Sequence, residues 1–209
     1  IEPPSPLPKT ADTRSTWHHI QFLRRDPRFT HFVLTRALFL STAFAVPFLV
    51  LLTRDTTNTG FSTLAGLLLA GGIADLFGGP VWGRQADRSS RKVLIASGAL
   101  AGLACLLAAA CSALGWQHPL PLAVLYLMLA LAHSGVRLGR STYLLDMTTP
   151  NNRADYTAVS NTVIGVLLLA GGTLSLLEPL LGPSGMVLLF GSGSLAAALA
   201  ATRLPELDS

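Results

Sequence analysis

The stretch that decides the fold is Gly79-Pro80-Val81-Trp82-Gly83-Arg84-Gln85-Ala86-Asp87-Arg88-Ser89-Ser90-Arg91-Lys92, a short charged turn between two long apolar runs. Two of its glycines lie four residues apart, a spacing that allows helices to approach one another closely. Its Asp-Arg pair can form ion pairs with a neighbouring segment, and its Arg-Lys pair puts positive charge at the start of the next apolar run. A turn of this kind is typical of the cytoplasmic connection between two helices that cross a membrane.

The composition of the chain points to the same class of protein. Hydrophobic residues make up 50% of the sequence and charged residues 12%, and the mean hydropathy is +0.51. A soluble domain carries about 25% charged residues, roughly twice this share. Runs of about 20 apolar residues are long enough to cross a bilayer. The sequence therefore predicts an all-α membrane protein with six transmembrane helices, at 29–52, 61–82, 93–114, 120–145, 156–181 and 185–201.

Basic residues gather at the ends of these spans, and Arg54 stands alone on the opposite side. The net charge of +4 therefore does not indicate nucleic acid, which would require a basic face with interleaved aromatic residues. By the positive-inside rule, both termini and the even-numbered connections are cytoplasmic. We expect an integral protein of a bacterial inner (plasma) membrane. The cytoplasmic set is Lys9, Arg14, Arg24, Arg25, Arg28, Arg84, Arg88, Arg91, Lys92, Arg140, Arg153 and Arg203.

The predicted organisation has four parts. Residues 1–14 are rich in proline and are expected to be a disordered linker. Residues 15–28 fit either a helix lying on the cytoplasmic membrane surface or a plain connector. Residues 29–203 form the six-helix bundle, and 204–209 form a cytoplasmic tail. Because the chain begins at Ile1 without an initiator methionine, inside a linker-like segment, we expect it to be a fragment of a longer protein.

A short internal repeat links two of the spans. Leu67-Leu68-Leu69-Ala70-Gly71-Gly72 recurs as Leu167-Leu168-Leu169-Ala170-Gly171-Gly172, and an acidic residue and a proline follow each copy. The copies fall in the second and fifth spans, which cross the membrane in opposite directions. They would be equivalent positions in an inverted repeat of three plus three spans. A coincidence between two leucine-rich segments is the alternative explanation.

Three charged residues lie inside the predicted spans. Arg36, Asp75 and Arg137 share a layer roughly 10 to 15 Å from the cytoplasmic face, at about 1.5 Å per residue. A charge at mid-span costs about 2.5 to 3.5 kcal/mol on insertion scales, so each must be paired or must face a water-filled cavity. His133, Arg137 and Arg140 follow an i, i+4, i+7 spacing and so share one stripe of a helix. We expect the side chains of that stripe to contact water or to pair with other polar groups.

These residues allow two interpretations. Asp75 is either a proton-coupling carboxylate or one member of a fixed ion pair that holds helices together. Arg36 and Arg137 either bind an anionic group of a substrate or neutralise Asp75, and two cations against one acid favour an anionic ligand. His133 is either a satisfied interior residue or a proton relay. We expect no metal site and no cofactor, because the His and Cys residues have no cluster of further ligands around them.

The charged turn resembles the loop signature of the major facilitator superfamily of transporters, with Ser90 where that family usually carries a glycine. The resemblance implies that the first and fourth spans line a central cavity, the third and sixth face lipid, and the second and fifth contact the other half. Arg36, His133 and Arg137 would then face the substrate path. Asp87 would meet the N-terminus of the fifth span and nearby arginines and hold the cytoplasmic side closed. The predicted gating residues are Gly79, Gly83, Asp87, Arg88, Arg91 and Lys92.

By this resemblance, the chain would be the C-terminal half of a secondary active transporter that moves a small solute by alternating access. Either Asp75 or residues in the other half would couple that transport to protons. Its partners would be the lipid bilayer, an N-terminal six-helix half of the same transporter and the solute. An intramembrane enzyme is disfavoured, because the sequence has no H-E-x-x-H, G-x-S-x-G or paired catalytic aspartates, and the absence of a P-loop disfavours transport driven by ATP. A non-transporting membrane scaffold or sensor, whose polar layer is purely structural, remains the alternative.

Overall fold

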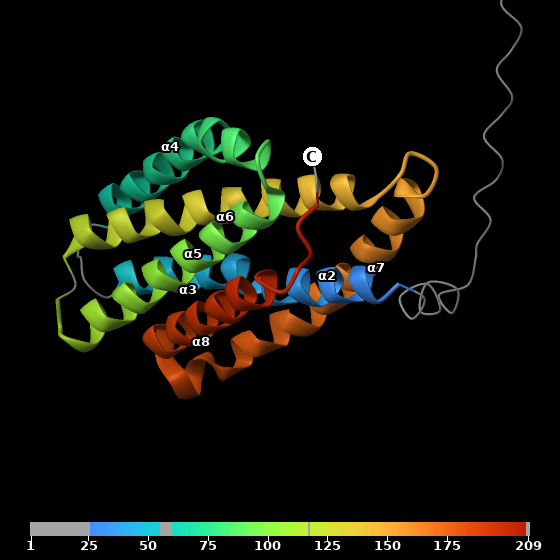
Figure 1. Ribbon diagram of the computed structural model, residues 1–209. Coiled ribbons are helices and arrows are strands. Elements are labelled where there is room, and N and C mark those ends of the chain that lie inside the picture. Colours follow the sequence, from blue (N-terminus) through green and yellow to red (C-terminus); the bar gives the residue numbers. More distant parts are fainter. Residues whose placement is uncertain (1–25, 55–59, 117, 208–209) are drawn as a thin grey trace, which may run out of the picture.

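All regular secondary structure that the computed structural model describes, in residues 26–54, 60–116 and 118–207, is helical (Figure 1). Both the predicted linker 1–14 and the predicted surface helix 15–28, as far as residue 25, lie outside the described residues. The elements in chain order are α2 (Pro27–Leu38), α3 (Leu40–Arg54), α4 (Gly60–Ala86), α5 (Ser90–Ala113), α6 (Pro119–Met147), α7 (Arg153–Gly172), the 3-10 helix η1 (Thr173–Leu177) and α8 (Glu178–Ala201).

The first predicted span, 29–52, consists of two helices that meet at Phe39. α2 starts at Pro27, where proline costs no hydrogen bond, and the Asp26 carboxylate caps it by accepting from the backbone N–H groups of Arg28 and Phe29 at 2.9 and 3.2 Å. At the junction, the Thr42 hydroxyl donates to the Phe39 carbonyl at 2.9 Å. The segment as a whole is long and apolar enough to cross a bilayer.

Five described segments are long and apolar enough to span a membrane: Pro27–Leu52, Ala65–Ala86, Ser90–Ala113, Leu120–Met147 and Arg153–Ala201. The last has 49 residues. As one straight helix it would be roughly 70 Å long, more than twice the thickness of the hydrocarbon core. It is interrupted by η1 and by a kink at Gly182, whose φ of 64° is outside the helical range. Figure 1 shows α8 returning towards the end of the bundle where α7 begins.

The predicted boundaries of these last two helices need correction. The sequence predicts one helix over 156–181, whereas α7 ends at Gly172 and a 3-10 turn follows. It predicts the next helix from 185, whereas α8 includes Glu178 onward, with the kink at Gly182 inside it. Leu174, Leu176 and Leu177 of the 3-10 turn are apolar. Hydropathy therefore does not distinguish this turn from an α-helix.

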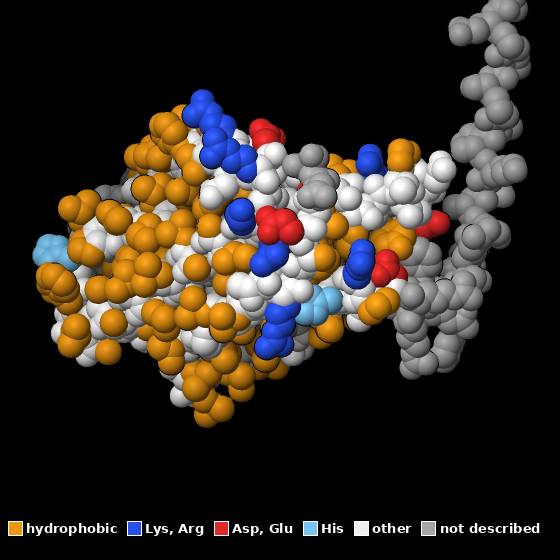
Figure 2. All heavy atoms as spheres, viewed as in Figure 1, with side chains coloured by type: hydrophobic (Ala, Val, Ile, Leu, Met, Phe, Trp, Pro, Cys, Tyr) orange, Lys and Arg blue, Asp and Glu red, His pale blue; other side chains and the backbone are white. Residues whose placement is uncertain are grey.

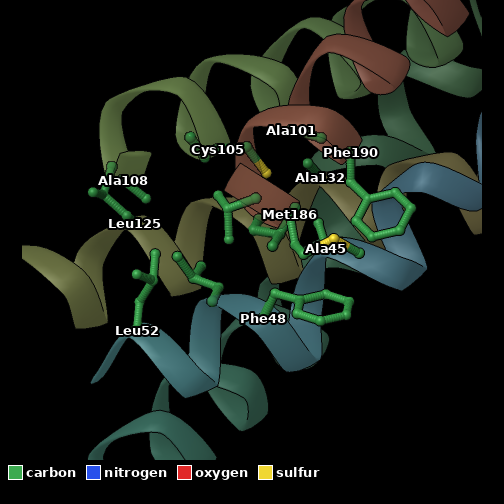
Figure 3. Packing of buried hydrophobic residues seen from close by; sticks show 14 residues of the cluster. Ala45, Phe48, Leu52, Ala101, Cys105, Ala108, Leu125, Ala132, Met186 and Phe190 are labelled. Atoms are coloured by element: carbon green, nitrogen blue, oxygen red, sulfur yellow. The ribbon is translucent and has the colours of Figure 1, made fainter. Parts of the chain in front are cut away.

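Small residues allow α5 and α8 to pack tightly along the middle of the bundle. A Cβ atom on Gly102 would lie 3.1 Å from the Gly191 carbonyl oxygen, and one on Gly191 would lie 2.6 Å from the Cys105 Cβ. Fully buried side chains from α3, α5, α6 and α8 surround this contact, with Met186 at the centre of the view in Figure 3. These four helices therefore build one dense core cluster, and a second cluster includes Phe29, Phe32 and Val33 of α2.

α4 and α7 are much less covered. Of the residues in α7, Val159, Ser160 and Ile164 are buried, while Leu169 is 80% exposed. On α4, Leu68 and Leu76 are likewise exposed. Figure 2 shows hydrophobic side chains over one end of the visible face and most of its charged side chains in a band towards the other. Both helices thus present apolar surface that this chain does not cover.

Candidate functional site

The polar layer of the bundle is positioned by a close contact between α4 and α6. Gly78 leaves no room for a Cβ atom against the side chain of Ser134, and a Cβ on Gly135 would lie 2.6 Å from the indole ring of Trp82. The Trp82 Nε1–H group donates a hydrogen bond to the Leu131 carbonyl at 2.8 Å. These contacts fix the two helices in register and so bring their polar side chains opposite each other.

Asp75 of α4 and Arg137 of α6 form an ion pair in this layer. The distance from Arg137 Nη2 to Asp75 Oδ1 is 3.1 Å, and the side chains are 53% and 70% exposed. A cleft of about 440 Å³ lies between the two helices beside this pair. Its walls are Asp75, Gly78, Gly79, Ser134, Arg137, Leu138 and Ser141. The pair therefore lies at an open polar surface of the chain, not inside the dense core.

Arg36 has other partners. Its guanidinium donates to the Ser160 hydroxyl and, at 2.8 Å, to the Asn161 side-chain oxygen, both on α7. Its Nε–H group is buried and has no hydrogen-bond partner among the described residues. Arg36 thus joins α2 to α7 through neutral oxygens, and Arg137 is the arginine that pairs with Asp75. Ser160 and Asn161 were not singled out in the sequence, where neutral side chains give no signal of depth or pairing.

The remaining members of the stripe on α6 are half-buried. His133 Nδ1 lies 3.1 Å from the Thr42 hydroxyl, a hydrogen bond that connects α6 to α3. Arg140 forms no hydrogen bond or ion pair within the described part of the chain. The stripe therefore contains one paired arginine, one unpaired arginine and one hydrogen-bonded histidine.

A second polar cluster lies where the charged turn meets the C-terminal tail. Ser89 caps α5 by accepting from the Lys92 backbone N–H, and its hydroxyl donates to Glu206 Oε1 at 2.8 Å. Arg91 Nη1 is 3.3 Å from Glu206 Oε2, and Lys92 Nζ is 3.8 Å from Oε1. The hydrogen bond from Ser89, followed by the charges of Lys92 and Arg91, lowers the pKa of the Glu206 carboxyl. Sequence reasoning missed Glu206, although an acidic residue in a tail on the same side as a basic loop is a usable signal.

Other contacts hold the tail beside this cluster. Leu204 is buried, and the Tyr143 hydroxyl donates to the Pro205 carbonyl at 3.0 Å. The Ser90 hydroxyl donates to Asp146 Oδ2 at 2.8 Å and so ties the start of α5 to the end of α6. The predicted tail, 204–209, is therefore packed onto the bundle as far as Glu206.

The other residues of the predicted gate are at the surface of the chain. Asp87 and Arg88 are exposed, and a Cβ atom on Gly79 or Gly83 would meet nothing within 4 Å. Within this chain, the close helix approach uses Gly78 instead. α7 begins at Arg153, earlier than the predicted start of the fifth span at 156, and a contact between its N-terminus and Asp87 stays a prediction.

The described residues contain no group of three His, Cys, Asp or Glu side chains that could hold a metal ion. The polar layer has the Asp75–Arg137 pair at an open surface between helices, whereas Arg36, His133 and Arg140 are half-buried. An exposed ion pair beside a cleft can bind a polar or charged solute.

Comparison with known proteins agrees with this architecture. A sequence model of the Major Facilitator Superfamily matches residues 32–208, which include every described helix from α3 onward and most of α2. No curated protein matches the sequence at a significant level. The chain therefore belongs to the Major Facilitator Superfamily, a family of membrane transporters.

Proposed function

We propose that the chain is the C-terminal six-helix half of a secondary active transporter that moves a small solute across the membrane by alternating access. The observation that carries this proposal is the Asp75–Arg137 ion pair beside an open cleft between α4 and α6. Charges at this depth are costly unless they are paired or wet, and they mark solute and proton pathways in membrane proteins. The last long segment turns back between α7 and α8, so it accounts for two crossings. With the four other long segments, this supports six crossings in total.

The uncovered faces of α4 and α7 support a second half of the same transporter as the partner. The two copies of the internal repeat fall on these two helices, and in both copies the second and third leucines are exposed: Leu68, Leu69, Leu168 and Leu169. Matching exposure at these two positions is what an inverted repeat of three plus three spans would give, whereas the first leucine differs, with Leu67 buried and Leu167 exposed. The N-terminal half would cover these faces, and lipid would cover the rest. The basic residues at the span ends favour cytoplasmic termini in a bacterial inner membrane.

In this proposal, Asp75 couples transport to protons. An ionised Asp75 holds Arg137, whereas a protonated Asp75 loses the charge that attracts the guanidinium and releases it into the cleft. Arg36, His133 and Arg137 are the proposed substrate-binding residues. Protonation would therefore change both the charge of the cleft and the position of a binding residue, which is the requirement for coupling the two events.

The charged turn would act as the cytoplasmic gate. Gly79, Gly83, Asp87, Arg88, Arg91 and Lys92 are the proposed gating residues, and the contacts of Glu206 with Arg91 and Lys92 support a closed cytoplasmic side in this conformation. Alternating access would require those contacts to break when the helices rock. A Cβ atom on Gly79 or Gly83 would meet nothing within 4 Å, so both positions leave space for close contact with the other half.

Proton-linked solute flux tests this proposal. The full-length transporter would be reconstituted in liposomes that contain a pH-sensitive dye, and a panel of solutes would be added with and without a pH gradient. We expect at least one solute to move protons, and Asp75→Asn to abolish the proton movement. Glu178→Gln removes an acidic group near the opposite end of the bundle and serves as the matched control. Proton-linked flux at an unchanged rate in Asp75→Asn would refute the coupling role, and no solute flux at all would favour the scaffold or sensor.

A further inference from the structure

A histidine lies at the centre of the longest helix that the structure describes. His133 is the middle residue of α6, which has 29 residues, and at about 1.5 Å per residue it is roughly 20 Å from either end. It is half-buried, and Arg137, one turn away on the same face of α6, lines the cleft beside Asp75. Ionisable side chains at this depth in a membrane protein mark solute and proton pathways. The imidazole therefore lies one turn deeper than the Asp75–Arg137 pair.

One ring nitrogen of His133 has a buried partner. Its Nδ1 atom lies 3.1 Å from the hydroxyl oxygen of Thr42 on α3. Thr42 is fully buried, so water does not compete for this contact. The same hydroxyl oxygen lies 2.9 Å from the Phe39 carbonyl oxygen, at the junction of α2 and α3. Thr42 Oγ1 thus has two close polar neighbours, a carbonyl oxygen and an imidazole nitrogen.

The single hydrogen of the Thr42 hydroxyl decides which nitrogen of His133 carries its hydrogen. A carbonyl oxygen can only accept, so Thr42 must donate for its contact with Phe39 to be a hydrogen bond. The oxygen of Thr42 then accepts from His133 Nδ1. If Thr42 donated to Nδ1 instead, two acceptor oxygens would face each other at 2.9 Å in a buried site with no hydrogen between them, which is unfavourable. Both contacts are hydrogen bonds only when Nδ1 carries a hydrogen.

This assignment leaves the other ring nitrogen as an acceptor. A neutral imidazole has one N–H group, so with the hydrogen on Nδ1 the Nε2 atom carries a lone pair. The hydrogen bond that one ring nitrogen makes thereby sets the role of the other. Nε2 gives this part of the polar layer a neutral acceptor, one turn from the Arg137 guanidinium, which can only donate.

We propose that Thr42 is a positioning residue that holds His133 in the Nδ1–H tautomer, and that Nε2 accepts a hydrogen bond from an N–H or O–H group of the transported solute. The inference rests on the proposed transporter function and names one feature of its solute, a hydrogen-bond donor. Thr42 acts through His133, because it is fully buried and has no surface for a solute to contact.

NMR of the purified full-length transporter, with isotope-labelled histidine, tests the tautomer. The nitrogen chemical shift distinguishes a nitrogen that carries a hydrogen from one that carries a lone pair, and the signal of His133 is the one that His133→Gln removes. At a pH at which the imidazole is neutral, we expect the hydrogen on Nδ1. Thr42→Val should abolish this preference, and Thr42→Ser should keep it. Thr35→Val is the matched control, because Thr35 is also buried and donates to a carbonyl of its own helix, that of His31, at 2.9 Å.

Solute flux tests the role of Nε2. The probes are the solute that gives the largest proton-linked signal in the liposome panel and analogues of it in which one N–H or O–H group is methylated. We expect one methylation to raise the apparent KM of the wild type about fivefold, as for the loss of one hydrogen bond. The same methylation should raise the KM of Thr42→Val little further. A purely structural Thr42 would change Tm and leave the ratio of the two KM values as in the wild type.

Substitutions of His133 separate its two nitrogens. The amide of glutamine reaches about as far as Nε2, whereas the amide of asparagine reaches only as far as Nδ1. We therefore expect His133→Gln to retain more affinity for the solute than His133→Asn. The reverse order would refute the contact between Nε2 and the solute.

The remaining outcomes distinguish this inference from the proposed function. A hydrogen on Nε2 in the wild type, or an unchanged tautomer in Thr42→Val, would overturn the positioning role and leave the transporter proposal intact. A solute whose methylated analogues all move as well as the solute itself would overturn the contact with Nε2, again without affecting that proposal. If no solute moves, the transporter proposal fails and the solute contact fails with it, whereas the NMR measurement still decides the role of Thr42.

Discussion

A methyl group at Gly135 should separate α4 from α6 and thereby disturb the polar layer. The added Cβ would lie 2.6 and 2.9 Å from two ring atoms of Trp82 and 2.8 Å from the Ser97 Cβ. Because carbon atoms prefer separations of about 3.5 to 4.0 Å, the helices must move apart by roughly 1 Å. Trp82 is buried and hydrogen-bonded to Leu131, so its ring has little freedom to turn away.

The magnitude follows from three terms. Overpacking a close contact costs about 1 to 3 kcal/mol, and weakening the Trp82 hydrogen bond costs about 1 kcal/mol. Replacing glycine by alanine inside a helix stabilises the folded state by about 0.5 to 1 kcal/mol, which offsets part of this cost. We therefore expect Gly135→Ala to lower the free energy of unfolding by about 1 to 3 kcal/mol. A shift of roughly 1 Å would also stretch the 3.1 Å contact between Arg137 and Asp75 beyond ion-pair distance.

Two further glycines serve as graded controls for this assay, which measures thermal unfolding and solute flux of the full-length transporter. A Cβ on Gly139, one turn along α6, would lie 3.1 Å from the flexible Leu94 side chain, so Gly139→Ala should cost less. A Cβ on Gly72 would meet nothing within 4 Å, so Gly72→Ala should be neutral or slightly stabilising. If all three variants unfold at the same temperature, the register of α4 and α6 does not depend on this contact and the reasoning fails.

Two other predictions concern the charged contacts. Glu206→Gln should release the C-terminal tail at every pH, measured as faster limited proteolysis after residue 203. Since partners lower the pKa of the Glu206 carboxyl in the folded protein, their stabilisation is present above its unfolded pKa and is lost as pH falls through the lowered value. Wild-type tail protection should therefore disappear only in acid, and protection of Glu206→Gln equal to the wild type would contradict the contact. A double-mutant cycle with Asp75→Asn and Arg137→Gln should give a coupling of about 0 to 1 kcal/mol in stability, because the pair is exposed, while either single change abolishes proton-linked flux. A large coupling in stability with unchanged flux would identify a purely structural pair.

The helical architecture could be read from the sequence because crossing a bilayer requires a long apolar run, and few other structures do. The residues at which helices end were harder to predict from the sequence. α4 continues to Ala86 and α6 to Met147, beyond the predicted ends at 82 and 145. Hydropathy marks where lipid ends, whereas a helix ends where its hydrogen bonds end. The break near Gly182 was foreseen as an interval between two apolar runs, but the 3-10 turn at Thr173–Leu177 carries no polar residue strong enough to reveal it.

The depth of the site residues in the membrane was predictable from the sequence, but the direction in which each side chain points was not. Counting residues from helix ends places Arg36, Asp75 and Arg137 in one layer, and the i, i+4 spacing places His133 with Arg137. Which arginine pairs with Asp75 depends on how each helix is rotated, and that is set by contacts such as Trp82 against Gly135. Sequence reasoning therefore allowed either arginine, and the structure brings Arg137 to Asp75.

Because the bundle is unevenly packed, Arg36 also affects how firmly α7 is held to α2. α5 and α8 are held together by close backbone contacts, and α4 is held to α6 by Trp82. α7 buries little of its surface, and both polar and apolar contacts hold it to α2. The polar contacts are Arg36 with Ser160 and Asn161, and the Tyr156 hydroxyl, which donates to Asp26 at 3.0 Å. The apolar contacts include the rings of Phe29 and Tyr156, which meet edge to face with centroids 4.6 Å apart. Displacement of the Arg36 guanidinium would remove the polar part of that attachment, because directional hydrogen bonds are lost with a small displacement of one partner. A solute that binds Arg36 would therefore be expected to shift α7, the helix proposed to contact the other half, and such a shift would link solute binding to the proposed rocking motion.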